Sequence, residues 1–267
     1  MTQTRVRTKK SLGQNLLVDQ QAVLKIVSAA DLTPDDVVLE IGPGPGTLTP
    51  HLAQRAGHVV AVEIDRQMLP SLQGSVQGLE NVAIVHGDIL EQNIPTLAGH
   101  KYKVVANLPY YITSSVLRHV LTSSARPTLM VITIQLEVAQ RIVAQAGKLS
   151  LLAVSVQFYG TPHIVARIPP GSFRPVPKVH SAVVRIDCFE QLPWGQVDEK
   201  AFFRTVRAGF AQRRKQLRNA LKSGLGRPIE EIVHALSAAE IDDKRRAQTL
   251  SIEEWVALSN ALIQAEG

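Results

Sequence analysis

The chain has one cysteine, few aromatic residues and no long apolar run. The single cysteine, Cys188, excludes an internal disulfide framework and a zinc site built from cysteines, and it is typical of a reducing compartment. No stretch of eighteen apolar residues is present, and the first residues lack an apolar signal segment. We therefore expect a cytoplasmic protein that has no membrane span and holds no metal.

The 267 residues carry 29 Lys and Arg against 23 Asp and Glu, which gives a formal net charge of +6. This length is sufficient for one large domain with a sizeable core and a second, smaller domain. The modest excess of positive charge favours a polyanionic partner.

Two hydrophobic periods alternate through the first part of the chain. Asp19 is expected to cap a helix whose apolar face includes Val23 and Ile26. Buried strands are predicted at 37–41, 58–63, 82–86, 103–106 and 129–134, with helices beginning near 47 and at 67–76 and 113–121, and two later strands at 164–168 and 179–186. Strands that alternate with helices predict a parallel, doubly wound α/β sheet, which binds ligands beyond the carboxyl ends of its strands.

The character of the sequence changes after Cys188. Residues 192–195 read as a linker, and from Asp198 onward the pattern is helical without strands. We predict a first domain at 1–190, which begins with a basic arm at 1–14, and an all-helical domain at 198–267. Treated as one helix, residues 203–222 place basic side chains on a common face, namely Arg204, Arg207, Lys215, Arg218 and Lys222.

A glycine-rich loop follows the first predicted strand of the sheet. Gly42, Gly44 and Gly46 let a ligand approach the backbone, and a loop between a strand and a helix favours a nucleotide-type cofactor. A dinucleotide fold has the pattern G-x-G-x-x-G, whereas this loop reads G-x-G-x-G. Glu40, just before the loop, would repel a pyrophosphate and suits a cationic ligand.

Acidic residues also end the next two strands. Glu63 is placed to accept hydrogen bonds from both hydroxyls of a ribose, and Asp88 is placed to accept one from an adenine amino group. With a cationic methionine group near Glu40 and Gly42, the set fits S-adenosylmethionine.

The strand at 103–106 leads into Asn107, Leu108, Pro109 and Tyr110. We interpret these four residues as a clamp for a planar amino group. The carboxamide can accept a hydrogen bond from an exocyclic amine, Pro109 stiffens the turn, and Tyr110 offers a flat face for stacking.

Five motifs together resemble the KsgA-type small-subunit ribosomal RNA adenine N6-dimethyltransferases. They lie in the family's order at 13–17, 40–46, 107–110, 173–179 and 212–219, and the resemblance spans about residues 8–262. It implies a class I (Rossmann-like) methyltransferase domain followed by a small helical domain. The cofactor contacts that it implies are Asn15, Leu17, Gly42, Glu63, Asp88 and Asn107, to which the reading of the loop adds Glu40 and Gly44.

The resemblance also implies a function. A monomer would dimethylate N6 of two adjacent adenines near the 3′ end of small-subunit (16S) ribosomal RNA. Asn107 Oδ1 and the Leu108 carbonyl would accept the N6 hydrogens, and the base would lie between Tyr110 and, as the family implies, Phe173. Cys188 is not expected to act as a nucleophile. Phosphate contacts are expected at Lys9, Lys10, Arg174, Lys178, Arg213, Arg214, Lys215 and Arg218.

Three residues depart from the family's common pattern: Leu16, Leu136 and His180 stand where Phe, Lys and Asp are usual. They leave the reaction class intact and bear on how RNA docks. The alternatives are an erythromycin-resistance-type enzyme acting on large-subunit RNA, and a non-catalytic RNA-binding assembly or transcription factor. Residues 173–179 and 212–219 favour the small-subunit type, and the intact clamp and acidic set favour an active enzyme.

Overall fold

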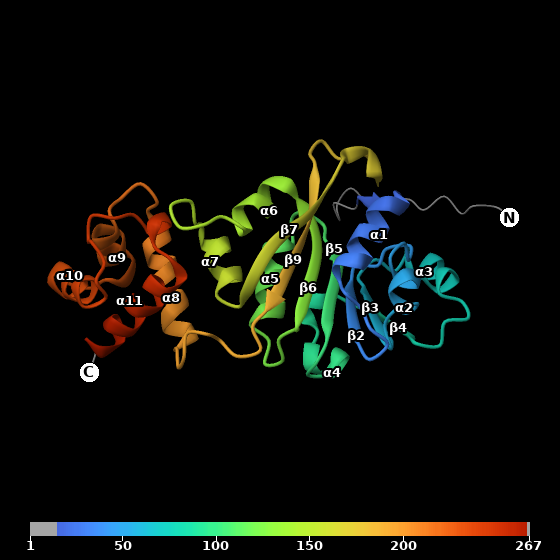
Figure 1. Cartoon of the computed structure of the whole chain (residues 1–267), viewed down its shortest axis with the longest axis horizontal. Helices are drawn as coiled ribbons and strands as arrows, with labels where there is room; N and C mark the ends of the chain where they lie inside the picture. Colours follow the sequence, from blue (N-terminus) through green and yellow to red (C-terminus); the bar gives the residue numbers. More distant parts are fainter. Residues whose placement is uncertain (1–14, 266–267) are drawn as a thin grey trace. The chain divides into compact units, whose positions relative to one another are not determined.

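The computed structural model describes residues 15–265, which fall into two compact units (Figure 1). The larger unit contains the chain up to Ala139 together with Gly160–Glu190. The smaller unit contains Gln140–Tyr159 and the chain from Gln191 onward. This division differs from the predicted domains in one segment, 140–159, because Phe158 and Tyr159 at its end pack against aromatic side chains of the helical unit.

A seven-stranded sheet in the order β4-β3-β2-β5-β6-β9-β7 forms the larger unit. Its strands are β2 (Val37–Ile41), β3 (His58–Glu63), β4 (Val82–His86), β5 (Lys103–Asn107), β6 (Leu129–Gln135), β7 (Gly160–Ile168) and β9 (Ser181–Cys188). The predicted α/β sheet is confirmed, with parallel pairing from β4 through β6. β9 instead runs antiparallel to both of its neighbours, since no crossover helix separates it from β7.

Helices cover both faces of this sheet (Figure 1). They are α1 (Gln20–Ala29), α2 (Thr49–Ala53), α3 (Leu69–Ser75), α4 (Ile94–Ala98) and α5 (Thr113–Leu121), and α6 (Leu136–Ile142) follows β6. Asp19 caps α1 as predicted, accepting a hydrogen bond from the Gln21 N–H at 2.9 Å. Short 3₁₀ turns lie at η2 (Ile89–Glu91) and η3 (Pro170–Ser172).

One face of the sheet buries Val38, Val59 and Val105 beneath the apolar sides of α1 and α2. Near the edge of this layer a second, two-stranded sheet pairs β1 (Leu16–Leu17) with β8 (Phe173–Arg174). It ties the start of the described chain to the proline-rich loop between β7 and β9.

The smaller unit consists of α7 (Leu151–Gln157), α8 (Glu199–Ala211), α9 (Leu217–Leu225), α10 (Ile229–Ala238), the 3₁₀ turn η4 (Ala247–Thr249) and α11 (Ile252–Gln264). The treatment of residues 203–222 as one continuous helix is wrong, although short helices were expected in this region. α8 ends at Ala211, and a turn precedes α9. The basic stripe drawn on one continuous helix therefore does not exist. Within residues 15–265, no helix is long and apolar enough to cross a membrane.

Candidate functional site

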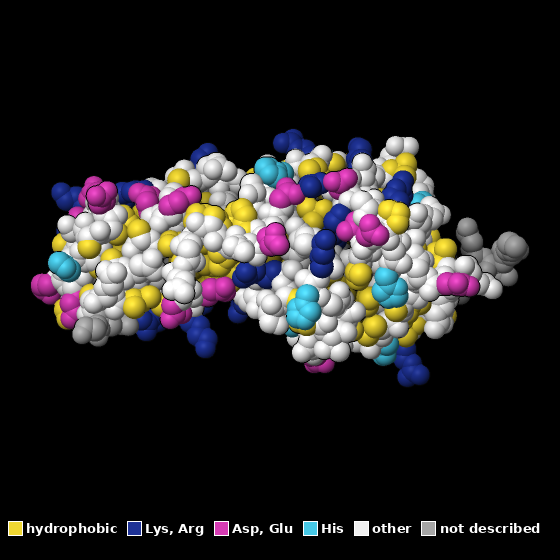
Figure 2. Space-filling view, turned by 60° about the horizontal axis from the view of Figure 1, so that its bottom comes forward, with side chains coloured by type: hydrophobic (Ala, Val, Ile, Leu, Met, Phe, Trp, Pro, Cys, Tyr) yellow, Lys and Arg dark blue, Asp and Glu magenta, His cyan; other side chains and the backbone are white. Residues whose placement is uncertain are grey.

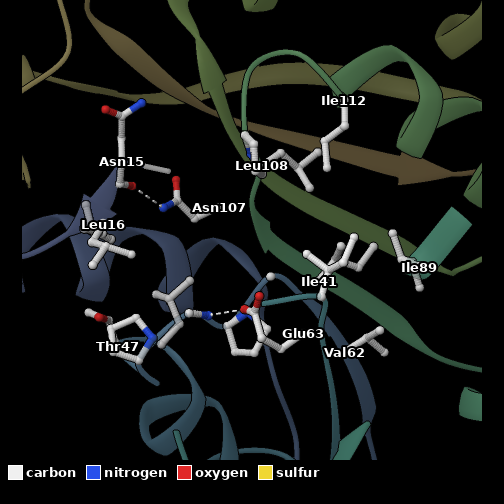
Figure 3. A pocket seen from close by; sticks show the side chains of 18 of the residues that line it. Asn15, Leu16, Ile41, Thr47, Val62, Glu63, Ile89, Asn107, Leu108 and Ile112 are labelled. Carbon is white, nitrogen blue, oxygen red and sulfur yellow. Dashed lines mark hydrogen bonds between the residues drawn. The ribbon is translucent and has the colours of Figure 1, made fainter. Parts of the chain in front are cut away.

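A cavity of about 340 Å³ opens at the carboxyl ends of β2, β3, β4 and β5. Ile41, Val62 and Ile89 form an aliphatic wall, and Asn15, Leu16 and Asn107 lie across from them (Figure 3). The cavity therefore occupies the position that a doubly wound sheet reserves for ligands.

The glycine loop forms the floor of the cavity in a conformation that side chains disfavour. Gly42, Gly44 and Gly46 have φ values of +70°, +58° and +90°. A Cβ at Gly44 would lie 3.3 Å from Leu16 Cδ2, and one at Gly46 would lie 1.9 Å from Ser75 Oγ. Glycine is required at Gly46 by both backbone angle and space.

Glu63 lines the cavity and holds the glycine loop in place (Figure 3). Its carboxylate accepts hydrogen bonds from the Gly44 N–H at 2.8 Å and from the Asp65 N–H at 2.7 Å. Burial raises the pKa of Glu63, and these two hydrogen bonds oppose the rise. Each carboxylate oxygen accepts one bond here and keeps a lone pair for a further donor.

Asp88 lines the same cavity at the end of β4. Its Oδ1 accepts a hydrogen bond from the Leu90 N–H at 2.9 Å and so caps the turn η2. This bond orients the carboxylate beside Ile89 and leaves its second oxygen able to accept from a ligand.

The clamp follows β5 and is fixed at three points. Asn107 Nδ2 donates to the Asn15 carbonyl at 3.2 Å (Figure 3), and the Leu108 N–H donates to the Thr133 carbonyl at 3.2 Å. The Tyr110 hydroxyl lies 2.9 Å from Ser181 Oγ. Because Asn15 takes the amide nitrogen of Asn107, Oδ1 is the atom of that carboxamide left to accept a hydrogen bond.

Glu40 is buried, with 1% of its surface exposed, and it does not line the cavity. The alternation of β2 turns its neighbour Ile41 to the cavity and Glu40 away from it. Burial, with a smaller contribution from the charge of Glu63, raises the pKa of Glu40 to about 8, and the nearby Thr49 hydroxyl opposes part of this rise. Neither carboxyl oxygen has a hydrogen-bond partner in good geometry among the described residues. Direct contact of Glu40 with a cofactor stays a prediction.

Phe173 lies in the wall of the cavity, but only 1% of it is exposed, and it packs in the main core opposite Leu17. Its role as the second face of the clamp stays a prediction. Several lining residues were not predicted from the sequence; two of them, Tyr111 and Ile64, are 61% and 49% exposed. The available signal was their position directly after Tyr110 and Glu63.

The predicted phosphate contacts lie in different settings. Arg213, Arg214 and Lys215 are exposed in the turn between α8 and α9, whereas Arg218 Nη1 lies 2.7 Å from Asp243 Oδ2. Lys178 is exposed, and Arg174 donates to the Phe173 carbonyl at 2.9 Å. Lys9 and Lys10 lie outside the described residues. On the face shown in Figure 2, basic side chains are interspersed with acidic ones.

Residues 15–265 contain no group of His, Cys, Asp and Glu arranged to hold a metal ion. Cys188 does not line the cavity, and burial raises the pKa of its thiol to about 12. The thiol is therefore protonated at neutral pH, which disfavours a nucleophilic role.

Known proteins with similar sequences were found over nearly the whole chain. The model of the family described as ribosomal RNA adenine dimethylase matches residues 5–264. The chain is 46% identical, over 255 residues, to ribosomal RNA small subunit methyltransferase A of Dehalococcoides mccartyi, covering 95% of this chain and 88% of that protein. It is 45% identical to the protein of the same name from Moorella thermoacetica, with 95% and 92% coverage.

Two solved structures share the fold over most of the chain. The 23S rRNA methyltransferase ErmE superposes with a TM-score of 0.74 at 28% identity, covering 94% of this chain and 100% of that one. A dimethyladenosine transferase from Plasmodium falciparum superposes with a TM-score of 0.82 at 23% identity, covering 94% and 98%.

Proposed function

The chain belongs to the ribosomal RNA adenine dimethylase family, and we propose that it transfers methyl groups from S-adenosylmethionine to N6 of adenines in small-subunit (16S) ribosomal RNA. Its higher identity to small-subunit enzymes, 46% against 28% for ErmE, favours the small-subunit substrate over the large-subunit one. The intact clamp and cavity favour an active enzyme over a factor that only binds RNA.

The residues of the cavity fit S-adenosylmethionine. Glu63 would accept hydrogen bonds from the ribose hydroxyls, and Asp88 would accept one from the adenine amino group, with Ile64 and Ile89 beside the ring. The backbone at Gly42 and Gly44 and the segment Asn15–Leu17 would enclose the methionine end. When bound, this cofactor supplies an electrophilic methyl group on a cationic sulfur.

The orientation of Asn107 carries the proposal. Its amide nitrogen is held by the Asn15 carbonyl, so Oδ1 can accept a hydrogen from an exocyclic amine. The anchored Leu108 backbone sets the position of the second predicted acceptor, the Leu108 carbonyl. Two acceptors for two N6 hydrogens direct the nitrogen lone pair away from the protein and toward the methyl carbon.

The chemistry follows from this alignment. Adenine N6 is a poor nucleophile because its lone pair is delocalised into the ring, and the two acceptors favour a pyramidal nitrogen. Their hydrogen bonds strengthen as nitrogen gains positive charge, so they stabilise the transition state more than the bound substrate. The proton becomes acidic only after alkylation, so no general base is needed before attack. Positioning of the reacting atoms supplies most of the rate increase.

The second methylation needs a change at the clamp. A monomethylated N6 has one hydrogen left, so Asn107 and Leu108 cannot both be satisfied as before. We propose that the base rotates between the two transfers, and that Tyr110, held by Ser181, keeps its stacking face in place during this step.

Further parts of the proposal concern RNA and assembly. The exposed Lys178, Arg213, Arg214 and Lys215 would contact phosphates, and Lys9 and Lys10 would add to them. We propose that the protein acts as a monomer in the cytoplasm on small ribosomal subunits during their assembly.

One experiment tests the substrate. The protein is incubated with labelled S-adenosylmethionine and, separately, with unmethylated small subunits, naked small-subunit RNA and large-subunit RNA, and the label is mapped by nuclease digestion and mass spectrometry. We expect dimethyladenosine at two adjacent positions of the small-subunit RNA. Label on large-subunit RNA, or on none of the three, would refute the proposal.

A variant tests the clamp. Asn107→Ala should lower the single-turnover rate of methyl transfer by about 10²-fold to 10³-fold, because one aligned acceptor is lost. Cofactor affinity, measured by calorimetry, should change much less. Asn260→Ala, which removes a carboxamide on α11 that is not part of the cavity lining, is the matched control. Full dimethylation by Asn107→Ala with normal cofactor binding would show that the clamp is misassigned.

A further inference from the structure

Tyr111 is the one exposed aromatic side chain among residues 15–265. Its exposed fraction is 61%, whereas the remaining Phe, Tyr and Trp side chains are buried or half-buried. In a chain with so few aromatic residues, an aromatic ring left in water at a ligand cavity is a candidate for binding.

Tyr110 and Tyr111 are neighbours in the turn between β5 and α5, but their side chains have different surroundings. The Tyr110 hydroxyl is bound to Ser181 on β9, so its ring is tied to the sheet. Tyr111 has no hydrogen bond and no ring contact within the described part of the chain, yet it lines the cavity. Its exposure places the ring at the mouth, while Leu108, 2% exposed, lies inside.

Stability of the fold does not account for this ring. An exposed side chain without partners adds little to the core, whereas Phe173, another aromatic residue of the cavity lining, packs in the core with 1% of its surface exposed. Nucleic-acid-binding proteins use exposed aromatic rings to stack bases that have left a helix.

The geometry points to Tyr111 as the stacking platform for the nucleobase next to the adenine held by the clamp; this inference rests on the proposed function. The target adenine must reach Asn107 inside the cavity, so it cannot also cover a ring at the mouth. Once the target leaves its stack, its neighbour loses a stacking partner at the point where the strand leaves the cavity. Tyr111 replaces that partner.

Two properties of the substrate follow. The neighbouring base should be a purine, since a purine presents more surface for stacking than a pyrimidine. For two adjacent adenines, the platform holds one adenine while the other is methylated. The ring matters for this role and the hydroxyl does not.

The first test compares Tyr111→Ala with Tyr111→Phe on unmethylated small subunits. Tyr111→Ala should raise KM for the RNA by about 5-fold to 30-fold, while kcat and cofactor affinity stay within about twofold of wild type. Tyr111→Phe should behave as wild type. Val165→Ala, which truncates an exposed apolar side chain on β7 outside the cavity, is the control. Unchanged KM in Tyr111→Ala, or an equal defect in Tyr111→Phe, overturns the inference.

The second test changes the RNA. Small subunits are assembled from ligated RNA in which the nucleotide on either side of a single target adenine is made abasic in turn, and both affinity and methyl transfer are measured. With one of the two abasic RNAs, the affinity of wild type should fall by about the same factor as the Tyr111→Ala substitution costs on intact RNA. The affinity of Tyr111→Ala itself should fall little further on that abasic RNA. Equal sensitivity of both proteins to the abasic site overturns the inference. If wild type binds these subunits but transfers no methyl group, the proposed function fails, and the affinities alone still decide whether Tyr111 stacks.

Discussion

The cores of the two units differ in the side chains that fill them. In the larger unit the buried side chains on the strands are mainly Val, Ile, Leu and Ala, as a sheet covered on both faces requires. In the smaller unit short helices pack around Phe158, Tyr159, Phe202 and Phe203, with the Phe158 and Phe202 ring centroids 4.2 Å apart. Large rings let short helices bury enough surface to hold together.

The units differ more in the charges they bury. The buried acidic side chains of the described chain, Glu40, Glu63 and Asp65, all lie in the larger unit, at the ends of β2 and β3 or just beyond. The smaller unit buries only neutral polar groups such as Thr205 and Ser259. Burying a carboxylate is costly, so these acids mark the region where stability is given up for ligand binding. The smaller unit buries no carboxylate among its described residues, so its core does not carry this free-energy cost.

Phe202→Ala should have a large effect on stability. It should also show that the stability of the smaller unit and cofactor binding by the larger unit are independent. Phe202 is fully buried between other rings, so its loss should lower the free energy of unfolding by about 3–5 kcal/mol. Cofactor affinity should be unchanged, because no cavity residue lies in that unit. Chemical denaturation and calorimetric titration measure the two quantities, with Val233→Ala on the exposed side of α10 as control. A fall in cofactor affinity that matches the loss of stability would contradict the independence of cofactor binding from the core of the smaller unit.

Gly46→Ala should act on the larger unit and on the cavity together. The added methyl group meets Ser75 Oγ, and the φ of +90° disfavours any side chain, so we expect a loss of about 2 kcal/mol in stability and weaker cofactor binding. Gly74→Ala is the matched control, since its Cβ meets nothing within 4 Å and its position inside α3 favours alanine. Adding Ser75→Gly to Gly46→Ala should recover the steric part of the loss. No recovery would mean that backbone strain alone sets the effect.

Glu40→Gln should show what the buried acid costs. The pKa of Glu40 is about 8 in the folded chain and near its usual 4.5 when unfolded, so the unfolded chain releases the proton first. The contribution of Glu40 to stability is therefore fully present below pH 4.5 and is lost as the pH rises from 4.5 to about 8. Glu40→Gln should match wild type near pH 4.5 and be more stable at pH 9, by up to about 5 kcal/mol. Denaturation at both pH values measures this. Equal pH dependence in both proteins would mean that Glu40 ionises freely.

The same variant decides the predicted contact between Glu40 and the cofactor. If the carboxylate acts on the cationic end of the ligand, Glu40→Gln loses cofactor affinity at pH 9, where the wild-type side chain is ionised, and calorimetric titration detects the loss. If Glu40 only supports the loop from behind, affinity stays unchanged while stability rises.

Hydrophobic periodicity and the acidic residues at strand ends were enough to predict several of the residues that line the cavity. The strands at 37–41, 58–63 and 82–86 have the predicted bounds, so Glu63 and Asp88 lie at the predicted edge of the sheet. Exposure could not be read in the same way. Phe173 is buried by pairing with Leu17, a contact distant in sequence, and Tyr111 is exposed by the turn before α5. The orientation of Glu40 was readable, because Ile41 beside it must face the opposite side of the strand.

The break between α8 and α9 could not be inferred from period alone, because no proline marks the turn and apolar residues return at nearly the helical spacing after it. The consequence is a different meaning for two basic residues that sequence had placed on one face. Lys215 is exposed in the turn, whereas the Arg218 guanidinium is paired with Asp243. The turn therefore leaves Lys215 exposed to solvent, and the ion pair of Arg218 with Asp243 ties the start of α9 to the segment before η4.

Lys215→Glu and Arg218→Gln should have the smallest effects, and the two variants should differ in kind. The first should change RNA affinity and the second should change stability. Lys215→Glu should weaken binding to small subunits by about 3-fold to 10-fold and lower the slope of log affinity against log salt by about one, since one phosphate contact is lost. Arg218→Gln should lower stability by about 0.5 kcal/mol, as a partly exposed ion pair contributes little, and should change RNA affinity less. Filter binding at several salt concentrations separates the two. Equal salt slopes for both variants would return Arg218 to the RNA-binding surface and show that its ion pair opens when RNA binds.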